Sequence, residues 1–492
     1  MLNPTAPLPL RDPSLFRQAC LVDGRWIEAA SGRSTAVRNP ATGEVLGSVP
    51  ALGRDETRAA IAAAHRAFPA WRALTAKERA AILRRLYDLM LANADDLALI
   101  MTSEQGKPLA EARGEVLYAA AFIEWFAEEG KRAYGEMIPT NATGRRILVL
   151  KEPVGVFAAI TPWNFPAAMI TRKCAPGLAV GCTGVVRPAS ATPFTALAIG
   201  ALAERAGLPP GVLNIVTGPS AEVGEELTAN PIVRKVSFTG STEVGKIILA
   251  RCAASVKRVS MELGGNAPFI VFDDADLDAA VTGALASKYR NTGQTCVCAN
   301  RILVQDGVYD AFAEKFADAV RGLKVGPGTE PGVVQGPLIN EDAVRKVEEH
   351  IADAIAHGAR VVAGGRRHAL GGTFFEPTVL VNVPSSARIF REETFGPVAP
   401  LFRFGKEEEA LRLANDTPYG LAAYFYARDV GRIMRVAEAL EYGIIGVNEG
   451  IISTEVAPFG GYKESGLGRE GAHHGLDEYL EVKYVALGGI GT

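Results

Sequence analysis

Five short apolar segments alternate with segments of helical pattern between residues 154 and 262, and this alternation constrains the fold more than any other feature. The predicted strands are Val154–Ile160, Gly184–Arg187, Val212–Thr217, Lys235–Thr239 and Arg258–Glu262. Strands that alternate with helices favour a parallel sheet with helices on both of its faces. The sequence therefore predicts an α/β protein whose first domain is a doubly wound, nucleotide-binding domain.

A second alternation begins after about Gly264 and predicts another α/β domain. Its predicted strands are Phe269–Phe272, Val398–Phe404, Leu421–Tyr426 and Ile444–Val447. Its predicted helices are Asp276–Tyr289, Val308–Leu323, Glu341–His357, Lys406–Asn415 and Val430–Glu441. An active site would then lie in the cleft between the two domains.

The first 130 residues are mostly helical in pattern, and Asp55–Phe68, Ala76–Ala92 and Glu111–Glu129 are examples. Asp55 is well placed to be the N-cap of the first of these helices. Residues 135–151 break the pattern: an apolar run flanked by charges follows a turn-like segment, which predicts an exposed hairpin.

The predicted elements divide the chain into three parts. We assign residues 1–134 and 152–262 to the nucleotide-binding domain and residues 263–457 to a catalytic domain. Residues 135–151 and 476–492 are predicted to be small β segments for oligomerisation, because Leu476–Tyr484 alternates like an edge strand.

The composition excludes several classes of protein. The formal net charge is −3 and there is no block of like charges, so no nucleic-acid partner is indicated. No stretch has the roughly 18 consecutive apolar residues of a membrane-spanning helix, and residues 1–18 do not resemble a secretory signal. The predicted location is therefore the cytoplasm. The six cysteines and six histidines show neither a disulfide framework nor metal-ligand spacing, so no metal site is predicted.

One glycine-containing segment has the position of a phosphate-binding turn. Gly240–Gly245 (GSTEVG) follows a predicted strand and opens a helix, whose N-terminus offers free backbone N–H groups and the positive end of a dipole. Glycine lets the backbone approach a phosphate closely. The segment is not the G-x-G-x-x-G fingerprint, so taken alone it is equally well interpreted as an ordinary capped helix.

Three further segments hold groups that can do chemistry together. Residues Asn291–Cys296 (NTGQTC) lead to a cysteine in a turn or at a helix start, where a thiolate is stabilised. Glu262 ends a predicted strand and is followed by two glycines, which aims its carboxylate into a cleft. Asn164 follows another strand, where ligands bind in open α/β sheets. Taken singly, such a cysteine is usually structural and such a glutamate is usually solvated.

Together with Phe238–Ser241 (FTGS) and Glu393–Pro397 (ETFGP), these segments resemble the aldehyde dehydrogenase superfamily. The match runs in the family's order from about Val22 to Tyr484, which is nearly the whole chain. The resemblance implies that Cys296 is the nucleophile, which forms a thiohemiacetal and then a thioester.

The resemblance also implies the remaining roles. Asn164 and the backbone N–H of Cys296 hold the oxyanion, and Glu262 activates the water that hydrolyses the thioester. The residues implied for the cofactor site are Trp163, Gly240, Ser241, Leu263, Glu393 and Phe395.

The choice of cofactor depends on one further segment. Relatives usually carry Lys-Pro-x-Glu or Lys-Pro-x-Ser there, and a glutamate at the last position favours NAD because it repels a 2′-phosphate. This chain has Arg187–Ser190 (RPAS). Ser190 admits NADP, and a guanidinium at Arg187 can pair with the 2′-phosphate in a bidentate way. We predict that NADP is used at least as well as NAD, while the change from lysine leaves ribose binding open.

Within the superfamily, the chain most resembles succinate-semialdehyde dehydrogenases. The local signatures are Ile170–Lys173 (ITRK), Lys288–Asn291 (KYRN), Cys296–Arg301 (CVCANR) and Gly450–Ser453 (GIIS). In that subfamily two arginines and a serine hold the distal carboxylate, and they correspond to Arg172, Arg290 and Ser453. Charge-assisted hydrogen bonds suit such a substrate. The arginines could instead belong to structural ion pairs.

The substrate and the class of protein stay open in several respects. Glutarate semialdehyde differs by one methylene, which is worth only about 1–3 kcal/mol. The chain could also be an esterase without a hydride step or a non-catalytic structural protein, although a structural protein has no reason to retain all three reactive groups. By resemblance, the chain forms a homodimer or homotetramer. Cys298 is either a small packing residue or a partner for Cys296 in a reversible disulfide, as in some relatives.

Overall fold

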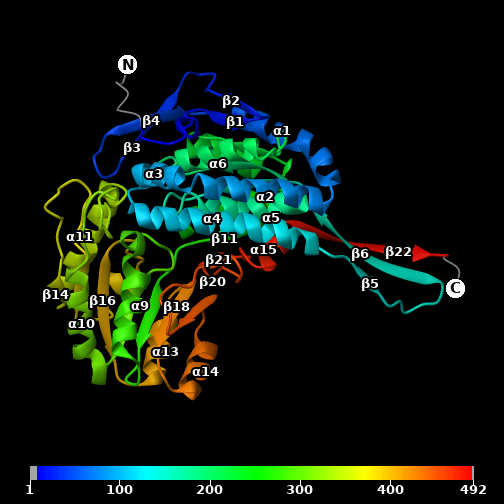
Figure 1. Ribbon diagram of the computed structural model, residues 1–492. Helices are drawn as coiled ribbons and strands as arrows, with labels where there is room; N and C mark the ends of the chain where they lie inside the picture. Colours follow the sequence, from blue (N-terminus) through cyan, green and yellow to red (C-terminus); the bar gives the residue numbers. More distant parts are fainter. Residues whose placement is uncertain (1–7, 490–492) are drawn as a thin grey trace.

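The computed structural model describes residues 8–489, which form two α/β domains and a projecting arm (Figure 1). The first domain contains an eight-stranded sheet in the order β2-β1-β9-β8-β7-β10-β11-β21. Its strands are β1 (Cys20–Val22), β2 (Arg25–Ile27), β7 (Val156–Ile160), β8 (Thr183–Arg187), β9 (Leu213–Ile215), β10 (Val233–Thr239), β11 (Arg258–Glu262) and β21 (Gly466–Leu467). The five predicted strands are the parallel centre of this sheet, so the doubly wound α/β prediction is confirmed.

Helices within residues 8–489 pack against this sheet or against the helices that cover it. They are α1 (Arg54–Ala73), α2 (Ala76–Ala92), α3 (Ala94–Gln105), α4 (Leu109–Glu129), α5 (Ala168–Val180), α6 (Phe194–Arg205) and α8 (Thr242–Ala253), together with the short α7 (Glu225–Ala229). The N-cap prediction was wrong, because the N-cap of α1 is Gly53 rather than Asp55. Glu56 accepts a hydrogen bond from the Gly53 N–H group at 3.0 Å, so the helix starts earlier and Asp55 falls in its first turn.

The mostly helical pattern of the first 130 residues concealed several short strands. Two of them, β1 and β2, extend the main sheet in antiparallel fashion, and β3 (Ser34–Arg38) and β4 (Val45–Pro50) form a separate hairpin. None of these strands exceeds six residues, so their period is too short to stand out beside the long helices.

The second domain contains a seven-stranded sheet in the order β14-β15-β16-β13-β12-β18-β19. Its strands are β12 (Ala267–Val271), β13 (Ala299–Gln305), β14 (Arg360–Ala363), β15 (Thr378–Val381), β16 (Val398–Phe404), β18 (Ala422–Tyr426) and β19 (Ile444–Val447). The sequence pattern missed β13, β14 and β15. The strand β13 was missed because Arg301 interrupts its apolar pattern. Arg301 is nevertheless fully buried, since its guanidinium donates to the backbone oxygens of Asn266, Leu413 and Ala414.

Helices cover both faces of this second sheet. They are α9 (Leu277–Tyr289), α10 (Tyr309–Arg321), α11 (Glu341–Ala356), α12 (Arg388–Arg391), α13 (Glu407–Asn415) and α14 (Val430–Ala439). The strands β17 (Tyr419–Gly420) and β20 (Tyr462–Lys463) pair in a small separate sheet. After β20 the chain returns to the first domain through β21 and α15 (His474–Asp477). In the sequence, the second domain therefore lies between two parts of the first domain.

The arm is a three-stranded antiparallel sheet that projects to the right in Figure 1. Its strands are β5 (Glu136–Ile138), β6 (Arg145–Pro153) and β22 (Leu480–Gly488), with β6 in the middle. The last strand begins four residues later than the predicted range 476–492, because residues 474–477 are helical, and residues 490–492 of that range lie outside the described part of the chain.

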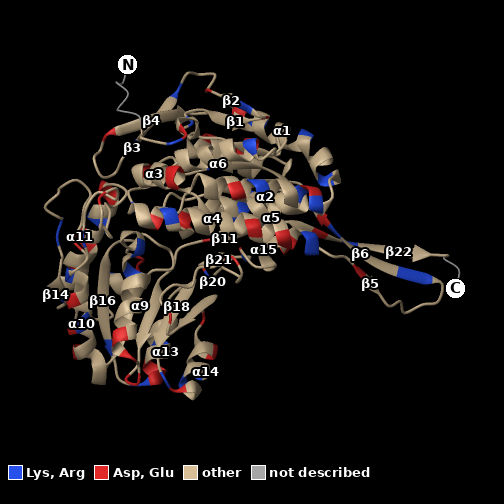
Figure 2. Cartoon of the chain, in the orientation of Figure 1, with Lys and Arg blue, Asp and Glu red and all other residues tan. Residues whose placement is uncertain are grey.

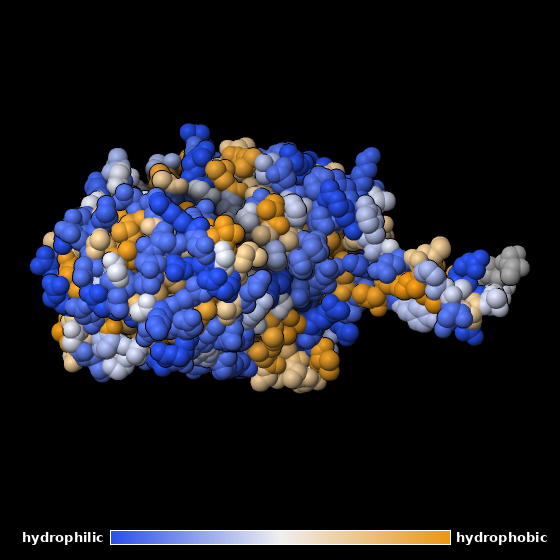
Figure 3. All heavy atoms as spheres, turned by 90° about the horizontal axis from the view of Figure 1, so that it is seen from below, coloured by the Kyte–Doolittle hydropathy of each residue, from blue (hydrophilic) through white to orange (hydrophobic). Residues whose placement is uncertain are grey.

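Charged residues of both signs are interspersed over both domains (Figure 2). Figure 3 shows the arm standing clear of the body with hydrophobic residues exposed along it. In residues 8–489 no helix combines the length and the apolar character that crossing a bilayer requires. That same part of the chain contains no group of three or more His, Cys, Asp or Glu side chains placed to hold a metal ion.

Candidate active site

The carboxyl ends of the parallel strands in the first domain carry several of the predicted site residues. Asn164 follows β7, Glu262 is the last residue of β11, and Ser241 lies between β10 and α8. Ser241 is the N-cap of α8 and its hydroxyl accepts a hydrogen bond from the Val244 N–H group. A Cβ on Gly245 would lie 2.4 Å from a methyl carbon of Leu263, so glycine is what admits Leu263 beside the helix.

A cavity of about 370 Å³ lies between these strand ends and the second domain. Eight predicted site residues line it: Trp163, Asn164, Gly240, Ser241, Leu263, Cys296, Glu393 and Phe395. Residues that the sequence did not indicate line it too, chiefly Ile339, Asn340, Asp342, Ala343 and Lys346 at the start of α11. Asn340 is the N-cap of α11, and nothing in the sequence shows that this helix end faces the cleft.

Cys296 lies in a turn just before β13. The approach to it is strained, because Asn291 and Thr292 adopt left-handed backbone angles with φ of 52° and 56°. The Asn291 side chain holds this shape by donating to the backbone oxygens of Asn164 at 3.0 Å and Gln294 at 3.2 Å. Burial raises the pKa of the Cys296 thiol to about 12, although the charge of Arg172 acts in the opposite direction. The thiol therefore needs a base to ionise it.

The carboxylate of Glu262 is 2% exposed, and neither of its oxygens has a hydrogen-bond partner among residues 8–489. Burial raises its pKa well above the ordinary value, and the negative charge of Glu470 raises it further. A carboxyl group with a raised pKa and no partner is suited to accept and release a proton.

A buried ion cluster lies behind Glu262. Arg172 and Lys173 on α5 both donate to Glu470, and the Arg172 guanidinium lies 4.1 Å from the centroid of the Phe459 ring. Burial opposes ionisation of Glu470, but the two cations outweigh it and hold its pKa at about 2. The Nη2 group of Arg172 is buried without an acceptor in the described chain, so this arginine keeps one donor free.

Glu393 and Phe395 lie on a segment whose backbone is held in an unusual shape. Phe395 has a φ of 56°, and its ring meets that of Trp163 edge to face at a centroid distance of 5.7 Å. Glu393 accepts a hydrogen bond from the Gly265 N–H group at 3.1 Å. The imidazole ring of His350, on α11, forms hydrogen bonds with the residues on either side of Glu393. Its Nδ1 lies 3.1 Å from the Thr394 hydroxyl and its Nε2 lies 3.2 Å from the Glu392 carboxylate.

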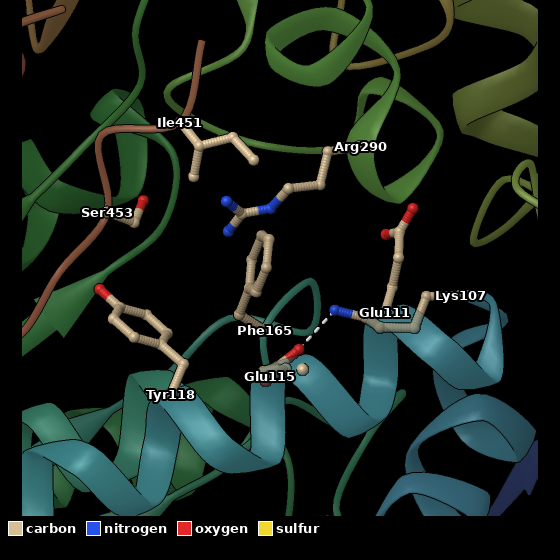
Figure 4. Close-up of a pocket in the computed structure, with 9 residues that line it drawn as sticks. Lys107, Glu111, Glu115, Tyr118, Phe165, Arg290, Ile451 and Ser453 are labelled. Atoms are coloured by element: carbon tan, nitrogen blue, oxygen red, sulfur yellow. Dashed lines mark hydrogen bonds and ion pairs between the residues drawn. The ribbon is translucent and has the colours of Figure 1, made fainter. Parts of the chain in front are cut away.

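A second cavity, of about 280 Å³, lies beside Phe165 (Figure 4). It is lined by Lys107, Glu111, Gly114, Glu115, Tyr118, Phe165, Arg290, Ile451 and Ser453. The structure therefore brings the predicted Arg290 and Ser453 together, while Arg172 is not among the lining residues. The Arg290 guanidinium lies 4.8 Å from the centroid of the Phe165 ring and has no ion pair in residues 8–489.

Arg187 and Ser190 lie outside both cavities, at the carboxyl end of β8. Arg187 is 8% exposed and donates to the Gly218 oxygen at 3.1 Å and the Ser220 hydroxyl at 2.7 Å, while Ser190 is exposed. Burial lowers the pKa of Arg187. Its Nε has no hydrogen-bond partner among the described residues.

The remaining cysteines are unpaired in the described chain. Cys298 is buried and its thiol lies 3.5 Å from the Lys288 carbonyl oxygen, so it packs behind the nucleophile loop.

Most of the residues that line the second cavity had no counterpart in the sequence-based prediction, and two of these residues are joined by an ionic contact. These two are Lys107 and Glu115. A lysine and a glutamate eight residues apart at the start of a helix look like a solvated surface pair, so no sequence signal distinguishes them.

Comparison with known proteins agrees with this geometry. A model of the aldehyde dehydrogenase family matches residues 26–485. The chain is 65% identical over 481 residues to a glutarate-semialdehyde dehydrogenase of Pseudomonas aeruginosa, covering 98% of this chain and 100% of that protein. It is 65% identical over 479 residues to an NADP(+) succinate-semialdehyde dehydrogenase of Escherichia coli, covering 97% of this chain and 99% of that one.

A solved structure shows the same fold. The crystal structure of an NADP-dependent enzyme of Escherichia coli has a TM-score of 0.97 to this chain at 65% identity, with 97% of this chain and 100% of that chain covered. The chain therefore belongs to the aldehyde dehydrogenase family.

Proposed function

We propose that this enzyme oxidises succinate semialdehyde to succinate with NADP or NAD. The observation that carries the substrate is Arg290, a cation without an anionic partner in the described chain, in the cavity beside Phe165. Ser453 lines the same cavity; Arg172, the second arginine that the sequence indicated, keeps an unpartnered Nη2 but is not among the residues that line it. Both Arg290 and Ser453 suit a carboxylate at the far end of a short aldehyde. Glutarate semialdehyde is the second candidate, because a relative 65% identical to this chain is named for it.

The proposed reaction starts at Cys296. Glu262 takes the thiol proton, and the thiolate attacks the aldehyde carbon to form a thiohemiacetal. The Asn164 side-chain amide and the backbone N–H of Cys296 stabilise the oxyanion. A nicotinamide cofactor, when bound, would accept the hydride of the thiohemiacetal, which would leave a thioester on Cys296. After Glu262 has released the first proton to solvent, it removes a proton from water, which attacks the thioester and releases the acid and the Cys296 thiolate.

The residues of the first cavity fit a nicotinamide cofactor. Thr239 lines it with a buried hydroxyl that has no partner in the described chain, and Gly240 leads into the N-terminus of α8. Glu393 and Phe395 would hold the ribose and the ring, and Arg187 would hold the 2′-phosphate of NADP, for which its unpartnered Nε keeps a donor. The NADP preference is supported by the relative from Escherichia coli that is named for NADP(+).

Replacing Arg290 with alanine tests the substrate. We expect Arg290→Ala to raise KM for succinate semialdehyde by roughly 10–100-fold, because a hydrogen bond to a charged group contributes about 1.5–3 kcal/mol. KM for an uncharged aldehyde of similar length should stay within about twofold, since it makes no charge-assisted bond. Steady-state kinetics on both aldehydes measures the ratio. Equal losses on the two substrates would refute the carboxylate role.

Replacing Glu262 with glutamine tests the base. The pKa of Glu262 is raised, so its basic form is populated only as the pH rises, and wild-type kcat should increase from neutral to alkaline pH. Glu262→Gln should lower kcat by about 10²–10⁴-fold and remove this rising limb. Rates measured across that pH range give the profile of each protein. A limb of unchanged shape in the variant would assign the titration to another group, such as the Cys296 thiol.

The cofactor proposal is tested with Ser190→Glu. The wild type should use NADP at least as well as NAD, and the added carboxylate should lower kcat/KM for NADP by more than about tenfold through repulsion of the 2′-phosphate. kcat/KM for NAD should change little, which serves as the internal control. A wild type that prefers NAD by more than about tenfold would contradict the assignment of Arg187 and Ser190.

Residues 135–151 and 476–492 are proposed to join subunits into a homodimer or homotetramer, in the cytoplasm. Met137, Val482 and Tyr484 are 72%, 65% and 64% exposed, which is unusual for apolar side chains on a projecting sheet. We expect the double variant Val482→Glu and Tyr484→Glu to reduce the assembly, as measured by light scattering after size exclusion. Glu314→Lys changes the charge of an exposed residue on α10, outside the arm, and should leave the assembly intact.

A further inference from the structure

A buried ion pair lies directly behind Asn164 and takes no part in the chemistry proposed above. Lys107 precedes α4 and Glu115 lies on it, and their side chains are 1% and 2% exposed. The Lys107 ammonium donates to the Glu115 carboxylate and, at 2.7 Å, to the backbone oxygen of Asn164. It also lies 4.0 Å from the centroid of the Phe165 ring. Figure 4 shows the pair beneath Phe165, on the far side of the ring from Arg290.

The second carboxylate oxygen of Glu115 binds the end of the loop between β7 and α5, the loop that contains Asn164. It accepts hydrogen bonds from the Ala167 N–H group at 2.9 Å and the Ala168 N–H group at 3.2 Å, where α5 begins. No side chain from the start of α5 itself caps this helix. The ion pair therefore ties the loop between β7 and α5 to α4 at two points, Asn164 and the first turn of α5.

Asn164 is held from its other side by the nucleophile loop. Its backbone oxygen accepts from the Asn291 side chain at 3.0 Å, and its own Nδ2 donates to the Gln294 oxygen at 3.0 Å. One N–H of the Asn164 amide is thereby used, and the other remains for the substrate oxygen. The direction of that free N–H depends on where the backbone of Asn164 sits between Lys107 and the Cys296 loop.

We propose that the Lys107–Glu115 pair is a positioning device that sets the Asn164 amide against Cys296, a proposal that rests on the oxyanion role of Asn164. Stability is a poor reason for such a pair, because replacing a buried ion pair with apolar groups is often neutral or stabilising. Correct placement of Asn164 is a better reason for the pair, since displacing a reacting group by about 1 Å can lower the rate about 10²-fold.

The test is a double-mutant cycle on the full-length enzyme with Lys107→Met and Asn164→Ala. Lys107→Met should lower kcat by roughly 10–100-fold in the wild-type background. Asn164→Ala should lower it by about 10²–10³-fold. If Lys107 acts through Asn164, adding Lys107→Met to Asn164→Ala should cost less than about twofold more, because interacting residues are not additive.

Two further measurements separate positioning from damage to the fold. NADPH binding, followed by its fluorescence, should keep its Kd within about twofold in Lys107→Met, and cofactor-independent ester hydrolysis should fall in parallel with kcat, since Cys296 and the oxyanion serve both reactions. Lys107→Met combined with Glu115→Gln removes both charges, leaves no unpaired buried ion and should show the same loss of kcat.

Each failure points to a different claim. An equal loss from Lys107→Met in both backgrounds would overturn the positioning proposal while leaving the role of Asn164 intact. A wild-type rate in Asn164→Ala would overturn the oxyanion role and the positioning proposal with it. A loss of NADPH binding in both Lys107 variants would show that the pair supports the fold and would also overturn the proposal.

Discussion

The cleft depends on one buried carboxylate, Glu470, which is the shared anion of two buried cations. Arg172 and Lys173 both donate to it, and the Ser237 hydroxyl on β10 also lies within 3.3 Å. Removing one partner from such a cluster leaves an uncompensated charge, which costs about 3–5 kcal/mol. Glu470 lies in the segment through which the chain returns from the second domain to the first. Its carboxylate therefore balances the charges of Arg172 and Lys173 on α5 of the first domain. Its charge also raises the pKa of Glu262, which couples the fold to the chemistry.

Buried charges near the cleft fall into two groups. Those that hold the framework are satisfied, as in the Lys107–Glu115 pair and the Glu470 cluster. Glu262, in contrast, is buried with no hydrogen-bond partner in the described chain, and the half-buried Arg290 forms no ion pair there. Burial without a partner raises the pKa of Glu262, so such a position marks a place where a water, a proton or a charged substrate completes the interaction.

The strand pattern and the order of motifs predicted the parallel centre of the first sheet, part of the second sheet and eight of the residues around the first cavity, because strand ends and glycine turns are local features. Tertiary pairings could not be predicted in this way. Arg172 and Arg290 look alike in the sequence, but Arg172 is engaged by Glu470, which lies 298 residues away. The strand β13 was not predicted, because a charged residue such as Arg301 is rarely fully buried in a strand. Arg301 is buried here because distant backbone oxygens accept its hydrogen bonds.

The arm has a consequence for the timing of synthesis. Its middle strand, β6, pairs along nine residues with β22, and Lys483 bonds Glu152 across 331 residues of chain. At about 5–20 residues per second, β6 leaves the ribosome roughly 15–65 seconds before its partner exists. During that interval β6 has only the three-residue strand β5 beside it and one open edge, which another nascent chain can occupy. Charged residues on β6, Arg145, Arg146 and Lys151, disfavour such pairing between identical chains until β22 closes that edge.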